Sequence, residues 1–266
     1  VGSAIYSADG KVLVLAGNKN TVSVIVADGT EVIKANAFEL AKNVAEISLP
    51  ASLVEVQANA LDNTAWFKNA NGLVYAGKVL YKVKGAIPNV AVEEGTVAIA
   101  DNAVNNPAVS TVLLPKSLVK IGDNAFAGSS VVAVAIPENV KYIGVGAFKD
   151  VKALKTLTIA DGVETIGAGA FEGCAALKAV AIPASVKLIP SDAFAGCKKL
   201  AKVEIAGAEK IGKYAFSGCA ALKTITLPTS LETLGAEAFR DCPKLTTVTI
   251  PASLKTMGAG AFARCT

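Results

Sequence analysis

The residues best suited to chemistry in this chain are five cysteines, which recur at intervals of 22 or 23 residues. A thiolate can act as a nucleophile or bind a metal, but the 266-residue chain has no histidine. That excludes Cys-His and Ser-His pairs and every zinc site that needs imidazole. The wide cysteine spacing matches no zinc pattern either. We expect a buried, reduced column, with a disulfide between adjacent repeats as the less favoured alternative: Cys174, Cys197, Cys219, Cys242 and Cys265.

Two other patterns imitate functional motifs. Glycine pairs such as Gly167-Ala168-Gly169 look like the start of a dinucleotide-binding fingerprint. That fingerprint needs a long helix after the glycines and an acidic residue about 20 positions further on. Carboxylates such as Asp161 and Glu164 are scattered, and no spacing selects a pair for glycoside chemistry. The sequence therefore predicts no catalytic residue, no metal site, no cofactor and no enzyme.

Composition narrows the class of protein further. Hydrophobic residues make up 52% of the chain, which is ample for a folded core. The longest purely apolar run covers only residues 131–136, whereas a membrane-spanning helix needs roughly 20 apolar residues. The net charge of +4 is small, and the cations do not cluster along the sequence. We therefore expect neither a membrane-spanning segment nor nucleic-acid binding.

A repeat of about 23 residues organises the elements that carry these residues. An Ala-Phe dipeptide recurs at gaps of 22 or 23 residues, and each cysteine follows a repeat phenylalanine by three positions. Phe38 ends an earlier copy, while Leu61 and Val104 occupy the same position in two weaker copies. Such a short unit cannot bury an apolar face alone, so the copies must stack. The regular repeat phenylalanines are Phe126, Phe148, Phe171, Phe194, Phe216, Phe239 and Phe262.

The repeat spanning residues 219–240 shows the expected order of elements. Leu222-x-x-Ile225-x-Leu227 has the alternation of a short strand, and the following proline marks its end. A second apolar pair, a glycine turn and Ala-Glu-Ala-Phe then close the unit. We predict an α/β-type repeat solenoid with a parallel sheet on the concave face and short helical or 3₁₀ turns on the other side.

The N-terminal third is less regular. Residues 66–86 lack the Ala-Phe signature, and turn signals at Asn71-Gly72 and Ala76-Gly77 predict one or two β-hairpins. We predict an N-terminal hairpin over residues 1–20 that caps the solenoid, a hairpin insertion over 66–86, and regular repeats over 105–266. Together these form one elongated domain covering residues 1–266.

The insertion also concentrates aromatic residues. Trp66, Phe67, Tyr75 and Tyr81 lie within 16 residues of one another, and tryptophan and tyrosine are frequent anchors in protein interfaces. We favour a packing role, in which they hold the hairpin against the flank of the solenoid. The alternative is an exposed site for a partner.

A second candidate surface follows from the strand pattern. Residues between the buried strand positions should point outward and form a flat strip rich in threonine and alanine. Such a strip either accommodates an extended chain or glycan weakly, or is plain solvated sheet. Its candidate contact residues are Thr158, Glu204, Thr226 and Thr249.

The repeat L-x-x-[IVL]-x-[IL]-P-x-x-[VL]-x-x-[IL]-G-x-x-A-F-x-x-C resembles the BspA-like leucine-rich repeat of bacterial surface proteins. The resemblance covers roughly residues 18–61 and 90–266, and the insertion is similar to the family's W-F…G-L-V-Y-x-G-K-V-L-Y segments. It implies a leucine-rich-repeat arc, secretion to the cell surface, and adhesion to host proteins or other cells.

We therefore expect a non-enzymatic, exported interaction module that binds a protein or cell-surface ligand. The alternative is a structural spacer, or a segment that self-associates. Thr266 follows Phe262 by four residues, so the next strand of the repeat is absent. That arrangement fits either a chain cut from a longer protein or an open edge that pairs with another copy.

Overall fold

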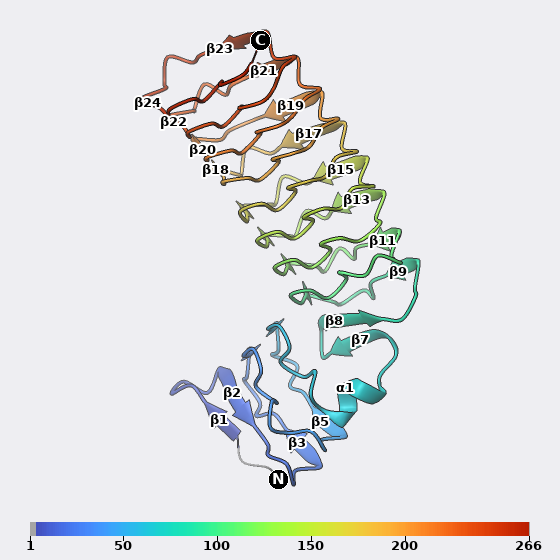
Figure 1. Cartoon of the computed structure of the whole chain (residues 1–266). Coiled ribbons are helices and arrows are strands. Elements are labelled where there is room, and N and C mark those ends of the chain that lie inside the picture. The colour runs from blue at the N-terminus through green and yellow to red at the C-terminus, as the bar shows by residue number, and fades with distance from the viewer. Residues whose placement is uncertain (1–3, 266) are drawn as a thin grey trace.

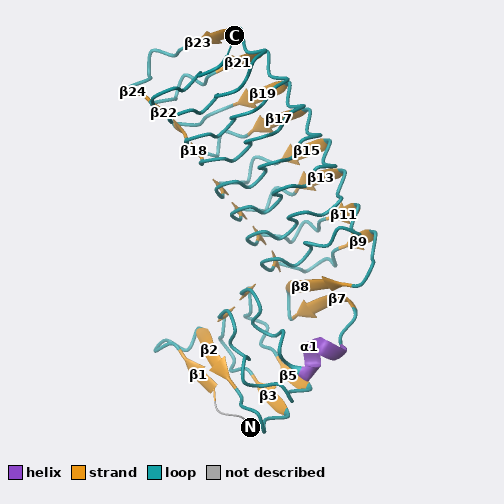
Figure 2. Ribbon diagram, in the orientation of Figure 1, coloured by secondary structure: helices purple, strands orange, loops and turns teal. Residues whose placement is uncertain are grey.

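The chain winds into an elongated solenoid whose successive coils stack along one axis (Figure 1). This computed structural model describes residues 4–265. A typical coil contributes one strand of three or four residues, one strand of two residues, and a closing turn. Loops and turns join these short strands throughout (Figure 2). The 23-residue period of the sequence is thus one coil of the solenoid.

The first of each coil's strands form the long-strand ladder, in which every recorded pair is parallel. Apolar side chains at alternate positions, such as Leu157 and Ile159, point inward, and the residues between them are exposed. This is the sheet that the alternation predicts. Its strands are β3 (Ser23–Ile25), β5 (Glu46–Ser48), β9 (Asn89–Ala91), β11 (Thr111–Leu113), β13 (Ala133–Ile136), β15 (Thr156–Ile159), β17 (Ala179–Ile182), β19 (Lys202–Ile205), β21 (Thr224–Thr226) and β23 (Thr247–Thr249).

A second, short-strand ladder runs along the solenoid and was missed in the sequence, because two residues are too few to show alternation. Its strands mostly contribute one inward residue each, such as Ile143 or Ile166. They pair in parallel across coils. The members are β2 (Val12–Ala16), β4 (Val32–Ile33), β6 (Glu55–Val56), β8 (Val79–Lys84), β10 (Ala98–Ile99), β12 (Lys120–Ile121), β14 (Tyr142–Ile143), β16 (Thr165–Ile166), β18 (Leu188–Ile189), β20 (Lys210–Ile211), β22 (Thr233–Leu234) and β24 (Thr256–Met257).

The Ala-Phe turns are not helical, so the predicted helical or 3₁₀ turns are wrong. Two residues before each phenylalanine the backbone has a positive φ, for example 51° at Asn124 and 60° at Gly146, which a right-handed helix does not allow. The N–H of Phe148 donates to the carbonyl of Ala170 in the next coil at 2.7 Å. The turns therefore form a third line of hydrogen bonds between coils.

Aromatic stacking fills the core behind these turns. The seven rings from Phe126 to Phe262 stack in one column, with centroids 4.8–5.5 Å apart and planes within 9° of parallel. Burying each ring contributes about 1.5–3 kcal/mol. The coils also approach closely at a glycine: a Cβ on Gly167 would lie 2.4 Å from the carbonyl carbon of Gly144. Identical residues at one position in successive coils thus set the stacking distance.

Two antiparallel pairs interrupt the N-terminal third. β1 (Ala4–Tyr6) pairs with β2, within the segment expected to form the N-terminal hairpin; residues 1–3 of that segment lie outside the described part. In the insertion, β7 (Gly72–Ala76) pairs antiparallel with β8, and β8 then pairs in parallel with β10. One strand of the insertion therefore serves as the short strand of its coil.

The insertion begins with a helix that the sequence analysis missed. α1 (Ala65–Asn69) is the only helix in the described chain. The side chain of Thr64 caps it by accepting a hydrogen bond from the N–H of Phe67 at 3.1 Å. At five residues the helix is too short to show periodicity in the sequence.

Candidate interaction surfaces

The predicted strip lies on the outward face of the long-strand ladder, and we call the outward residues of β13–β23 the outer strip. Thr158, Glu204, Thr226 and Thr249 are all exposed, as the alternation predicts. Register places Thr226 beside Thr249 on neighbouring strands. The same register places Thr158 beside an alanine of β13 and Glu204 beside an alanine of β17. The outer strip is therefore a low-relief surface of hydroxyl and methyl groups.

The charged residues of the outer strip gather on β19. The ammonium of Lys202 lies 2.7 Å from the carboxylate of Glu204, so these two charges neutralise one another at the surface. Shallow hollows of about 240 and 370 Å³ flank the pair. Asp161 lines the first of these, and Thr224 and Thr226 line the second. The hollows offer hydroxyls, methyls and one ion pair, which suits contact with an extended chain better than enclosure of a small molecule.

The aromatic residues of the insertion are largely committed to packing. Tyr81 is only 2% exposed, which agrees with the favoured packing role; its place among the candidate contact residues is wrong. Its hydroxyl donates to Asp62 and accepts the N–H of Leu61 at 3.1 Å. Burial and the hydrogen bond to Asp62 raise the pKa of Tyr81 far above its usual range. Tyr81 thus belongs to the buried core of a coil that lacks the Ala-Phe signature.

The other three aromatic residues are partly buried. The Phe67 ring meets Tyr81 edge-on at 5.4 Å between centroids, and the Lys84 ammonium lies 4.5 Å from the centroid of the same Phe67 ring. The hydroxyl of Tyr75 accepts the N–H of Glu93 at 2.9 Å. Trp66 packs against the core from α1 and keeps part of its side chain exposed. The packing interpretation accounts for Phe67 and Tyr75, and Trp66 retains surface that a partner can reach.

The cysteines form a column in which Cys265, at the last coil, is partly exposed and the other four are buried; all five are free. Each thiol donates to the carbonyl of a phenylalanine in the preceding coil; from Cys197 to Phe171 the distance is 3.3 Å. Burial raises the pKa of Cys197 to about 12. No cluster of metal-ligating side chains occurs within residues 4–265. The burial of Cys174, Cys197, Cys219 and Cys242 agrees with the predicted buried column.

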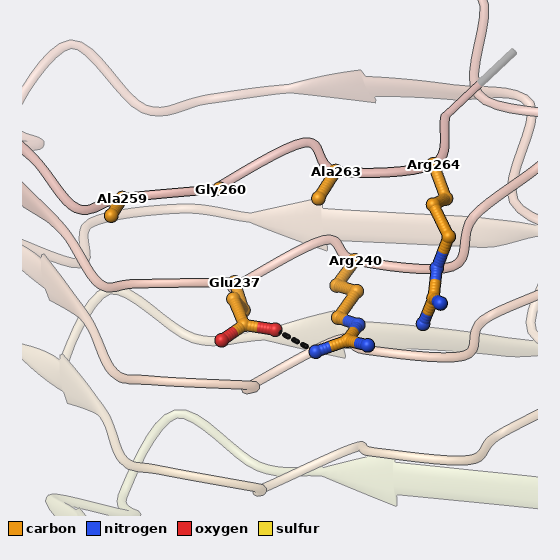
Figure 3. A pocket seen from close by; sticks show the side chains of 6 residues that line it. All are labelled: Glu237, Arg240, Ala259, Gly260, Ala263 and Arg264. Atoms are coloured by element: carbon orange, nitrogen blue, oxygen red, sulfur yellow. Dashed lines mark hydrogen bonds and ion pairs between the residues drawn. The ribbon is translucent and has the colours of Figure 1, made fainter.

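The last coils carry a charged hollow of about 370 Å³ on the turn side (Figure 3), and no sequence pattern indicated it. Glu237 and Arg240 form an ion pair across it. The guanidinium of Arg264 lies 2.5 Å from Asp241. The hydrogen bond from Arg240 lowers the pKa of Glu237. Because these charged side chains already form ion pairs with one another, we interpret them as contacts that connect neighbouring coils.

Stacked parallel strands with one Ala-Phe turn per coil define a leucine-rich-repeat solenoid. The family model described as BspA type leucine rich repeat region matches residues 15–73, 75–201 and 189–266, in six copies. The chain belongs to this family, as the repeat predicted. No curated protein matches the chain. No helix in the described residues is long and apolar enough to cross a membrane.

Solved structures of bacterial leucine-rich-repeat proteins resemble the chain in fold. A leucine-rich-repeat protein from Eubacterium ventriosum shares 19% identity with a TM-score of 0.53, over 93% of this chain and 78% of that one. A leucine rich cell surface protein from Faecalibacterium prausnitzii shares 21% identity with a TM-score of 0.46, over 99% of this chain and 90% of that one. At these identities the likeness concerns the fold alone.

Proposed function

We propose that the chain is a non-enzymatic interaction module, exported to the cell surface, that binds a protein or cell-surface ligand across the outer strip. Membership of the BspA-type family supports the class of function. The observation that carries the proposal is the outward face of β13–β23, in which threonine and alanine side chains of paired strands lie in register and only β19 contributes charged residues. Many weak contacts along such a face add up to useful affinity when they form together.

A substitution pair tests the strip. Thr226→Arg with Thr249→Arg places two large cations on the outer strip, where exposed positions tolerate them. Thr165→Arg with Thr256→Arg makes the same charge change on exposed positions of the short-strand ladder. Binding of each variant to immobilised extracellular matrix proteins is then measured. We expect the first double variant to lose binding and the second to keep it. Equal binding by both would contradict a role of the outer strip in ligand binding.

Trp66 is the second part of the proposed surface, because its side chain is partly exposed and, unlike those of Phe67 and Tyr75, makes no ring pairing or side-chain hydrogen bond among the described residues. Trp66→Ala should weaken binding to the same matrix proteins more than Lys68→Ala, an exposed change on the same helix. Unchanged binding would confine the site to the outer strip. In this proposal residues 1–266 act as one domain.

A structural role is the alternative function, and exposed apolar side chains on the last described coil are its candidate contacts. Ile250 and Met257 are 44% and 48% exposed there. Self-association through this face would place coils of two copies against one another. Sedimentation of the chain and of a Met257→Lys variant tests it: association lost in the variant supports this role, and a monomer in both cases rejects it.

A further inference from the structure

Exposed lysines gather along one edge of the long-strand ladder. The segments that lead from the Ala-Phe turns into β15–β23 contain seven lysines that are all exposed. None of the seven forms an ion pair in the described residues. We call them the basic row: Lys152, Lys155, Lys178, Lys198, Lys199, Lys223 and Lys244.

Hydrogen bonds show that these segments occupy equivalent places in successive coils. The N–H of Leu177 donates to Cys174, and that of Leu200 donates to Cys197, both at 3.0 Å. Between coils, the N–H of Ala201 donates to the carbonyl of Lys178 at 2.9 Å. Neighbouring strands in such a stack lie about 4.8 Å apart. The lysines therefore lie on equivalent segments of five successive coils, one or two to a coil.

Carboxylates near the basic row are mostly occupied elsewhere. Glu172 lies 2.8 Å from Lys149, and Asp241 pairs with both Arg240 and Arg264. Asp150 is the carboxylate on these segments that makes no ion pair among the described residues. Lysines that are scattered along the sequence thus lie together on the segments of this edge. The small net charge of the whole chain conceals a strongly positive local surface.

We propose that the basic row binds a linear sulfated polysaccharide. The residues between the lysines are mainly small, such as Ala175, Ala176 and Ala220, so a ribbon-like polymer can approach without steric hindrance. Lysine ammonium groups act as compact, mobile charges and do not require a planar anion. A row of them along five coils matches a polymer that carries one anionic group after another. This surface is separate from the outer strip, and neither proposal depends on the other.

The same segments argue against two other polyanions. Single-stranded nucleic acid binds through aromatic side chains that stack on the bases, and residues 149–155, 172–178, 195–201, 217–223 and 240–246 contain no aromatic residue. Peripheral membrane binding usually adds large apolar side chains that enter the lipid. None of the large exposed apolar residues of the described chain belongs to these segments.

Heparin oligosaccharides of defined length provide the probe. Affinity is measured by surface plasmon resonance over a range of salt concentrations, for the chain and for Lys178→Gln/Lys199→Gln/Lys223→Gln. The matched control is Lys116→Gln/Lys187→Gln/Lys210→Gln, which removes three exposed lysines outside the row. Because each lysine close to an anionic surface contributes to binding, the row variant, which lacks three, should bind roughly 100-fold more weakly. Its affinity should also depend less steeply on salt, and the control should bind as the unmodified chain does.

Three outcomes would overturn the proposal. Equal losses of heparin affinity in the row variant and the control would show that net charge, and not the position of the lysines, determines binding. Equal binding of desulfated heparin would remove the role of the sulfates. Tighter binding of duplex DNA, or of phosphatidylserine vesicles, through the same lysines would assign a different class of partner. Thermal unfolding of both variants, expected to match that of the unmodified chain because all six lysines are exposed, confirms that they fold.

Discussion

The regular coils and the junction around the insertion solve the same packing problem differently. From Phe126 to Phe262 a ring stacks on an identical ring, and from Cys174 onward each thiol repeats one hydrogen bond. Around the insertion each contact occurs once. In the regular coils, the same residue types at the same repeat positions make the same contacts each time. Where the repeat is interrupted, different contacts must stabilise the stack.

The junction contains a long-range polar contact as well as packing. The ammonium of Lys120 on β12 lies 2.5 Å from the carboxylate of Glu55 on β6, and 65 residues separate the two in the sequence. Between them in the chain lie α1 and the hairpin of β7 and β8. The insertion is therefore spanned by an ion pair, while Tyr81 fills its interior. The junction is therefore stabilised by individual side-chain contacts that the repeat does not supply.

Phe194→Ala should have the largest effect, because it breaks the regular column. Phe194 is fully buried between Phe171 and Phe216, and neighbouring coils cannot collapse into the hole. We expect the free energy of unfolding to fall by about 3–5 kcal/mol, measured by urea denaturation followed by circular dichroism. Phe262→Ala, at the partly exposed end of the column, is the control and should cost less. Equal losses would show that position in the column does not matter.

Tyr81→Phe tests the junction by removing one oxygen. The change leaves the N–H of Leu61 without its acceptor and Asp62 without its donor. An unsatisfied buried donor costs about 1–3 kcal/mol, so urea denaturation should show a loss of that size. Tyr75→Phe removes a hydroxyl that accepts one N–H in a more exposed place and should cost less. A neutral Tyr81→Phe would mean that ring packing alone holds the junction.

Glu55→Gln should have the smallest effect and should depend on pH. Burial raises the pKa of Glu55, but hydrogen bonds from Lys120 and Gln57 and the charge of Lys120 outweigh it, so the pKa lies below its ordinary value. A carboxyl with a lowered pKa stabilises the fold above its ordinary pKa and loses that contribution as the pH falls through the folded-state value.

At neutral pH, the free energy of unfolding of the unmodified chain should therefore be about 0.5–1 kcal/mol higher than that of the Glu55→Gln variant. The difference should vanish in acid, as measured by urea denaturation at several pH values. Glu31→Gln, whose partner Lys11 is well exposed, is the control and should change stability less. A pH-independent difference would contradict an electrostatic role for Glu55.

The sequence predicted what the repeat encodes and missed what occurs once. Phase-locked phenylalanines and cysteines were sufficient for the solenoid, and alternation in Thr156–Ile159 predicted which residues face outward. Two-residue strands and the five-residue α1 leave no periodic signal. The burial of Tyr81 depends on its contact with Asp62, a pairing between coils that no local pattern specifies.

The distribution of charged side chains in space was also not predictable from the sequence pattern. The lysines of the basic row stand at different offsets within their repeats, as Lys178 and Lys199 do, so they look scattered along the chain. Only the stacking of coils brings them to one edge. Lys149 and Arg240 are neutralised by ion pairs with carboxylates. The sequence pattern does not predict these pairs either.

The hydrogen-bonded cysteine column has a consequence for redox chemistry. Thiol–disulfide exchange begins with a thiolate that can reach another sulfur, and burial together with a pKa near 12 keeps Cys197 protonated at neutral pH. A solenoid with this column can therefore pass through an oxidising compartment without cross-linking its own coils. Cys265, which is partly exposed at the last coil, is the position where oxidants and alkylating reagents should react first.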